Sequence, residues 1–148
     1  MRSLYFAYGS NLSAEQMAAR CPGSKVVGRA ILPNHALTFA GHSASWGGAV
    51  ANVVRTAGGQ VEGVLYELPR GAINLLDRFE GHPFAYRREQ RRVLNEFGSW
   101  RRAYVYVQPE AEPGRPPLGY LGLIFREYKR REFDVGPLAV AAEMGVRP

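Results

Sequence analysis

Segments of apolar and β-branched residues, separated by glycine and proline turns, dominate the chain from its start to Val107. Such segments predict short strands when turn residues bound them. Helical patterns are few and are scattered among the strands rather than alternating with them. This order predicts an α+β domain built on a closed or nearly closed sheet. Strands are expected at residues 4–8, 25–39, 50–55, 60–68, 86–95 and 101–107.

Glycine and proline positions give three further expectations. The Pro33-Asn34 pair interrupts residues 25–39, so this segment forms two strands or one bent strand. Residues 57–59, with the sequence Ala-Gly-Gly, are expected to form a hairpin-like turn between the strands on either side. The glycine-rich residues 41–48 and the proline-rich residues 109–117 are expected to be loops.

Short helices are predicted where capping residues or helical spacing occur. Residues 13–20 begin with a capping box, in which the Ser13 hydroxyl and the Gln16 side chain each cover a free backbone N–H. Residues 70–80 form a short amphipathic helix that ends at Glu80, with Gly81 as its C′ residue. Two further helices are expected at residues 118–131 and from Pro137 onward.

The length and composition indicate one domain over residues 1–148. The 148 residues, 46% of them hydrophobic, can fill a core without disulfides. Cys21 is the only cysteine, so no internal disulfide or zinc knuckle can form, and a reducing compartment fits. No apolar run approaches the roughly 20 residues of a membrane span, and the first residues lack the apolar core of a secretion signal. We therefore expect a cytoplasmic protein with no membrane partner.

The chain is basic, with 19 Lys and Arg residues against 13 Asp and Glu and a formal net charge of +6. Only Lys25 and Lys129 are lysines. The arginines fall into several separate groups rather than one basic tail, a pattern that favours solvated faces over a nucleic-acid site. A nucleic-acid partner is therefore not expected.

Several kinds of catalytic site are excluded by their missing motifs. The three histidines, His35, His42 and His82, show neither a helical pair nor a cysteine partner, so no metal site is expected. Residues 41–45 lack the closing glycine of a serine-hydrolase motif, and no phosphate-binding or dinucleotide-binding glycine loop occurs. Nothing places a base beside Cys21, which is more typical of a small packed thiol.

Two features remain that could belong to a catalytic or binding site. Residues 8–12, with the sequence Tyr-Gly-Ser-Asn-Leu, combine a strand end, a glycine turn and a helix start, which can point backbone N–H groups at an anion. The same residues also suit an ordinary turn between a strand and a helix. Glu80 lies at a helix C-terminus, where the dipole disfavours a negative charge and raises the pKa of the carboxyl. Taken alone, this placement is typical of a solvated terminal glutamate.

In order along the chain, these features resemble the gamma-glutamylcyclotransferase family. Residues 5–12, Tyr-Phe-Ala-Tyr-Gly-Ser-Asn-Leu, closely resemble the family's opening signature. Residues 75–81 resemble its second motif, whose glutamate is the catalytic base, and residues 86–88 are similar to the strand that follows. Residues 117–121 resemble a late segment whose tyrosine, here Tyr120, lines the substrate pocket. The resemblance implies a small mixed β-barrel with surrounding helices.

The resemblance also implies an enzyme that converts a γ-glutamyl amino acid or γ-glutamyl amine to 5-oxoproline and a free amine. The substrate's own α-amine attacks its own γ-carbonyl, so no cofactor, metal or protein nucleophile is expected. Glu80 is the expected general acid and base. The backbone N–H groups of Gly9, Ser10, Asn11 and Leu12 are expected to hold either the substrate carboxylate or the developing oxyanion.

Tyr8 and Tyr120 are also expected to bind substrate, Tyr8 as a wall of the pocket and Tyr120 through its phenol. Each suits an aromatic core position equally well. The alternative function is a non-catalytic binding module for a carboxylate-bearing γ-glutamyl metabolite. A small-molecule γ-glutamyl substrate is the expected partner. A homodimer is compatible with the sequence, although no strand or helix shows a surplus apolar face for it.

Overall fold

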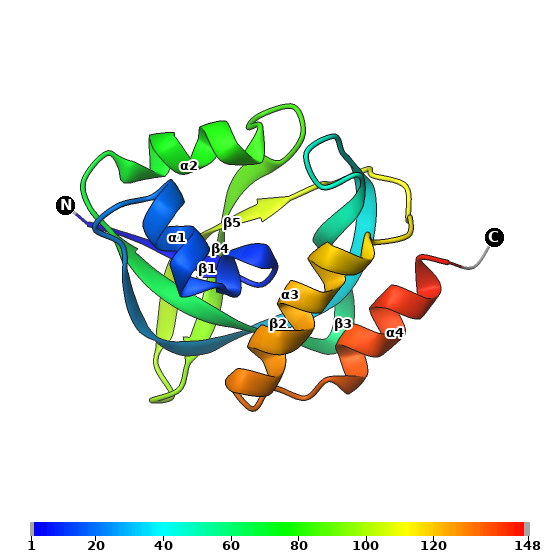
Figure 1. Cartoon of the computed structure of the whole chain (residues 1–148). Helices are drawn as coiled ribbons and strands as arrows, with labels where there is room; N and C mark the ends of the chain where they lie inside the picture. The colour runs from blue at the N-terminus through cyan, green and yellow to red at the C-terminus, as the bar shows by residue number, and fades with distance from the viewer. Residues whose placement is uncertain (1, 147–148) are drawn as a thin grey trace.

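The computed structural model describes residues 2–146, in which five strands form a closed barrel with helices around it (Figure 1). Around the barrel the order is β1-β3-β2-β4-β5, and every neighbouring pair is antiparallel except β1 and β5. That parallel pair, with Tyr5 opposite Tyr104, closes the barrel. The predicted mixed β-barrel is therefore confirmed. The strands are β1 (Ser3–Ala7), β2 (Lys25–Ser43), β3 (Gly48–Leu68), β4 (Arg87–Asn95) and β5 (Trp100–Val107).

β2 and β3 form one long hairpin with a bulge near its middle. Pro33 pairs with Gln60 and His35 pairs with Arg55, so residues 56–59 of β3 lie opposite a single residue of β2. That residue, Asn34, has a φ of 60°, and its Oδ1 accepts from the N–H of Gly58 at 3.2 Å.

The bulge corrects the predicted hairpin-like turn at residues 57–59. The glycines add residues to one strand instead of reversing the chain, because both halves of β3 pair with the same partner strand. Residues 25–39 belong to one bent strand, one of the two predicted forms. β2 continues through Ser43, so the predicted loop at 41–48 is reduced to the turn that leads into β3.

The predicted helices form close to their expected bounds. Ser13 caps α1 as predicted, with its hydroxyl accepting from the N–H of Gln16 at 3.2 Å. α1 contacts α2, α3 contacts the short helix η1, and α4 packs on β2. No helix within residues 2–146 is long and apolar enough to cross a membrane. The helices are η1 (Ser10–Leu12), α1 (Ala14–Arg20), α2 (Ala72–Glu80), α3 (Leu118–Arg130) and α4 (Gly136–Met144).

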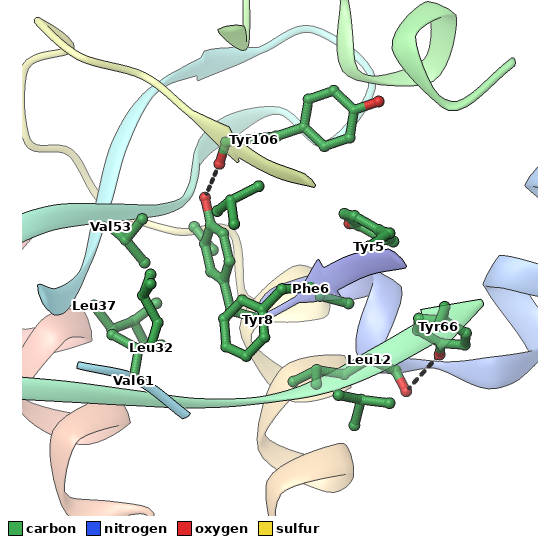
Figure 2. Close-up of a cluster of buried hydrophobic side chains, with 14 of the residues drawn as sticks. Tyr5, Phe6, Tyr8, Leu12, Leu32, Leu37, Val53, Val61, Tyr66 and Tyr106 are labelled. Atoms are coloured by element: carbon green, nitrogen blue, oxygen red, sulfur yellow. Dashed lines mark hydrogen bonds between the residues drawn. The ribbon is translucent and has the colours of Figure 1, made fainter. Parts of the chain in front are cut away.

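All five strands contribute buried side chains to one core. Figure 2 shows part of it, with Phe6 and Tyr8 of the β1 segment beside aliphatic residues of β2 and β3. The hydroxyl of Tyr8 donates to the carbonyl of Tyr106 at 2.5 Å (Figure 2). The rings of Tyr5 and Tyr106 meet edge to face, with centroids 5.7 Å apart. Tyr5, Tyr8 and Tyr106 therefore belong to the core and also line the candidate site.

Candidate active site

The turn after β1 lies beside a narrow recess and contains two backbone N–H groups without an acceptor in the described part of the chain. Ser10–Leu12 forms one turn of 3-10 helix, in which the N–H of Leu12 donates to the Gly9 carbonyl at 3.0 Å. The N–H groups of Ser10 and Asn11 have no acceptor within residues 2–146, as is usual for the first amides of a helical turn. Both residues line the recess, so their amides are available to an anionic oxygen.

Gly9 allows this turn to lie against the barrel. A Cβ at this position would lie 3.1 Å from the Cβ of Ala51 and 3.3 Å from the hydroxyl oxygen of Tyr120. The first distance is shorter than ordinary van der Waals contact between carbons. A side chain at residue 9 would therefore push the turn away from the strand that carries Ala51.

The five residues of the opening motif divide between the recess and the core. Tyr8, Gly9, Ser10 and Asn11 line the recess. Leu12 does not, because its side chain is fully buried in the core and its N–H is used within the 3-10 turn. The structure therefore brings four of the five residues to the recess and does not bring Leu12 there.

The end of α2 places Glu80 at the same recess. Gly81 follows with a φ of 71°, its N–H donates to the carbonyl of Arg78, and the N–H of His82 donates to the carbonyl of Asp77. These two bonds form a Schellman cap, which ends the helix at Glu80 as the sequence predicted. The carboxyl therefore lies at the negative end of the helix dipole and against the turn after β1.

Asn11 connects this turn to Glu80. Its side-chain Nδ2 donates to Oε1 of Glu80 and to the hydroxyl of Tyr5, each at 3.0 Å. Its Oδ1 accepts from Nε2 of Gln16 at 2.9 Å and from Nη1 of Arg20 at 3.2 Å. The two donors on the oxygen fix which end of the amide faces Glu80.

Gln16 departs from the predicted capping box. Its side chain donates to the Ser10 hydroxyl at 2.7 Å as well as to Asn11, instead of covering a backbone N–H at the start of α1. The reciprocal half of the capping box is therefore absent. The structure assigns Gln16 to the support of the site residues.

Burial raises the pKa of Glu80 to about 7. The guanidinium of Arg20 and the hydrogen bond from Asn11 lower this pKa, while the carboxylate of Asp77 raises it further. Because the desolvation effect is the largest, the carboxyl exchanges its proton near neutral pH. Burial also raises the pKa values of Tyr5, Tyr8 and Tyr86 well above their usual range, so these phenols stay neutral around Glu80.

Tyr120 and Tyr86 both bind the backbone of β3 at Ala51. The hydroxyl of Tyr120 accepts from the N–H of Ala51 at 2.8 Å, and the hydroxyl of Tyr86 donates to the carbonyl of Ala51 at 2.5 Å. Both tyrosines line the recess. The sequence left Tyr120 open between pocket and core, and the structure gives it both environments, because its side chain is buried and still lines the recess.

Comparisons with known proteins identify the family of this chain. A family model described as "Gamma-glutamyl cyclotransferase, AIG2-like" matches residues 5–122. The chain belongs to this family. A human gamma-glutamylcyclotransferase is 35% identical over 82 residues, which cover 53% of this chain and 44% of the human protein. The chain therefore matches less than half of the length of that relative.

Solved structures share the fold of this gamma-glutamyl cyclotransferase family member. A structure described as a gamma-glutamyl cyclotransferase aligns with a TM-score of 0.84 at 25% identity, covering 100% of this chain and 89% of that chain. A human protein described as uncharacterized aligns with a TM-score of 0.83 at 26% identity, covering 99% of this chain and 88% of its own. The barrel and its helices are thus those of the family.

In this family member, several residues of the recess could not be found from the sequence. Tyr5, Tyr86 and Tyr106 come from three different strands or strand ends, and Ala51 comes from a fourth. A weak signal for Tyr5 and Tyr86 exists, since both fall within the segments that resemble the family. Among residues 2–146, no group of three or more His, Cys, Asp or Glu side chains is placed to hold a metal ion.

Asp77 supports the recess without lining it. Its Oδ1 accepts from the hydroxyl of Tyr106 and its Oδ2 accepts from Nη1 of Arg88, each at 2.6 Å. Both carboxylate oxygens of Asp77 are therefore committed to partners. Within residues 2–146, Glu80, the other carboxylate near this end of α2, accepts a hydrogen bond only from Asn11, and its second oxygen has no partner.

Proposed function

We propose that the protein is a γ-glutamyl cyclotransferase that converts a γ-glutamyl amino acid or a γ-glutamyl amine to 5-oxoproline and the free amine. The observation that carries this proposal is the placement of Glu80. Its carboxyl has a pKa of about 7, lines the same recess as Ser10 and Asn11, and has one oxygen without a hydrogen-bond partner in the described part of the chain. Membership of the family supports the same reaction.

The proposed reaction begins with the substrate's α-ammonium group, whose pKa is about 8. The Glu80 carboxylate takes a proton from it, and the resulting amine attacks the γ-carbonyl carbon of the same molecule. A carbon–nitrogen bond forms, and the carbonyl oxygen becomes an oxyanion. The two pKa values lie close together, so the proton transfer has little energetic cost.

The tetrahedral intermediate then collapses to products. Protonated Glu80 donates its proton to the leaving nitrogen, and the carboxylate formed in this way takes the second proton from the ring nitrogen, which became cationic in the attack. The oxyanion re-forms the carbonyl as the original carbon–nitrogen bond breaks, which gives 5-oxoproline and the free amine. Glu80 then passes its proton to the released amine or to solvent. The free N–H groups of Ser10 and Asn11 hold an anionic oxygen of the substrate, and an oxyanion-hole donor of this kind contributes about 3–4 kcal/mol in other enzymes. Tyr5 and Tyr86 line the same recess as Glu80 with uncharged phenols, so they limit the access of water to its carboxylate.

The test is a mass-spectrometric assay for 5-oxoproline after incubation with γ-glutamyl amino acids and γ-glutamyl amines. We expect product from the wild type and a loss of about 10²-fold or more in kcat for Glu80→Gln, the usual effect of removing a general acid–base group. Glu15→Gln, an exposed substitution of the same kind on α1, is the matched control. A folded, fully active Glu80→Gln variant would overturn the proposal.

A further inference from the structure

A cavity of about 370 Å³ lies where strands β2 and β4 have separated, and it shares no lining residue with the recess around Glu80. The pairing between β2 and β4 joins Ala30 to Asn95 and Ile31 to Leu94. The cavity lies beyond these pairs, because it is lined by His35 of β2 and by residues 87, 89 and 91 of β4. It is therefore a second space, separate from the candidate active site.

Charged side chains of β4 line this cavity from the core face of their strand. Arg87, Glu89 and Arg91 alternate along β4 on the same face as Val93, whose side chain is fully buried. Their pairing partners on β5 are all buried hydrophobic residues. Charged residues rarely occupy such a face unless they have partners of opposite charge.

The charges in the cavity are only partly balanced. Glu89 accepts from Nε of Arg87 and from Nη2 of Arg91, each at 2.5 Å. Arg55 of β3 also lines the cavity, and its side chain makes no hydrogen bond or ion pair within residues 2–146. Because Glu89 is the only carboxylate among the lining residues, three guanidinium groups surround one negative charge. This excess of positive charge attracts anions.

Two buried nitrogen atoms of this cluster lack a hydrogen-bond partner. His35 is only 4% exposed, and its Nε2 has no partner in the described part of the chain. The Nε of Arg91 is also buried without an acceptor there. Buried polar atoms are nearly always paired, and each exception calls for an explanation. An anionic ligand in the cavity would supply acceptor oxygens to both nitrogens.

The tautomer of His35 links anion binding to a proton. Its Nδ1 lies 2.9 Å from the carbonyl oxygen of Pro33, which can only accept, so Nδ1 carries the hydrogen of the neutral ring. Burial lowers the pKa of His35, and the charges of Arg91 and Arg55 lower it further, against the effect of the Pro33 carbonyl. An anion beside the ring offsets the two arginine charges, so Nε2 takes up a proton when the anion binds.

We propose that the cavity between β2 and β4 is a binding site for a phosphate monoester, held by Arg55, Arg91 and His35. A phosphate dianion matches the excess positive charge and offers three acceptor oxygens to these three side chains. The cavity is of the size of small-ligand sites, roughly 300–1,000 Å³, and is larger than a phosphate group needs. Three valines and a proline line the rest, so the organic part of the ester is small and apolar.

The test is calorimetric titration with phenyl phosphate, phenyl sulfate and inorganic phosphate. The two phenyl esters have similar shapes, but at pH 7.5 only the phosphate ester is mainly a dianion. Arg55→Gln removes the arginine without a partner. Arg70→Gln is the matched control, because Arg70 is an exposed arginine before α2 that does not line the cavity.

We expect phenyl phosphate to bind the wild type more tightly than phenyl sulfate or inorganic phosphate. Arg55→Gln should weaken the binding of phenyl phosphate by about tenfold or more, as expected when a hydrogen bond to a charged group is lost. Arg70→Gln should bind like the wild type. Inorganic phosphate that binds as tightly as phenyl phosphate would overturn the ester and leave free phosphate as the ligand.

The role of His35 is tested by proton uptake. Titrations of phenyl phosphate at pH 7.5 in two buffers with different ionisation enthalpies give the number of protons taken up on binding. We expect the wild type to take up more protons than His35→Gln, in which the amide donates without a proton. Equal uptake by the two proteins would remove His35 from the site.

Two results would overturn the site itself. One is a wild type that does not bind phenyl phosphate at millimolar concentration. The other is equal affinity of Arg55→Gln and Arg70→Gln for this ester. Phenyl sulfate that binds as tightly as phenyl phosphate would overturn the phosphate assignment in favour of a singly charged anion. None of these measurements uses turnover, so the proposed reaction at Glu80 stands or fails independently of them.

Discussion

The side-chain amide of Asn11 donates to Oε1 of Glu80 at 3.0 Å and joins the turn after β1 to the last residue of α2 across 69 positions of sequence. Gln16 and Arg20 hold the oxygen of the same amide. Rotation of the amide would break all of these bonds at once. The carboxyl that we propose as the base is therefore held in place by residues of the opening motif and of α1.

Replacing Asn11 by alanine is expected to raise the pKa of Glu80, because the hydrogen bond from Asn11 lowers it. The acidic limb of the pH profile of kcat/KM should then move to higher pH. At pH 7 the rate should fall about tenfold, the usual effect of losing one hydrogen bond to a charged group. The control is Asn74→Ala, an exposed substitution on α2. An acidic limb that stays in place in Asn11→Ala would contradict the coupling.

Gly9→Ala and Gly122→Ala are expected to change stability in opposite directions. The new methyl at residue 9 meets Ala51 and Tyr120 within 3.3 Å, and overpacking of this kind costs about 1–3 kcal/mol. At Gly122, inside α3, nothing lies within 4 Å of the new methyl, and alanine gains up to about 1 kcal/mol over glycine in a helix. Urea unfolding measures both. Equal stability changes at the two positions would show that the turn is not closely packed on the barrel.

Tyr120→Phe is expected to destabilise the fold by about 1–3 kcal/mol, because it leaves the buried N–H of Ala51 without an acceptor. The hydroxyl of Tyr104 makes no hydrogen bond within residues 2–146 and that residue is only half-buried. For Tyr104→Phe we therefore expect a change below about 0.5 kcal/mol. Urea unfolding of both variants tests the difference, and a Tyr120→Phe variant as stable as the wild type would refute it.

The raised pKa of Glu80 also predicts how stability depends on pH. The folded protein binds this proton more tightly than the unfolded chain, so the stabilisation that it gives is present below about pH 4.5 and is lost as the pH rises through 7. Glu80→Gln, which has no charge to bury, should melt at a higher temperature than the wild type at pH 8, with a smaller difference at pH 4. A lower melting temperature for Glu80→Gln at pH 8 would contradict the shift.

Local sequence signals predicted the parts of the fold that depend on neighbouring residues. The end of α2 at Glu80 follows from Gly81, which adopts the left-handed conformation that a Schellman cap requires. The start of α1 follows from the hydroxyl of Ser13. The bulge at residues 56–59 was wrongly predicted as a turn, because only the pairing with β2 decides whether glycines reverse a strand or widen it.

The site was predictable only in part for a similar reason. Glu80 and the turn at residues 9–11 could be named because their motifs are contiguous. The role of Gln16 could not be predicted from the sequence. Whether its side chain covers a backbone N–H of α1 or donates to Asn11 depends on where the fold places Asn11. The tyrosines around Glu80 meet only when the barrel closes, so spacing along the chain carries little information about them.

The most direct test of the account is the pH dependence of kcat/KM for 5-oxoproline formation between pH 5 and pH 9. If Glu80 is the base and its pKa in the free protein is about 7, the rate should fall tenfold for each pH unit well below pH 7. Glu80→Gln should retain at most a small residual activity over the whole range. A wild-type rate that stays constant from pH 7 down to pH 5 would contradict the assignment of Glu80 as the base.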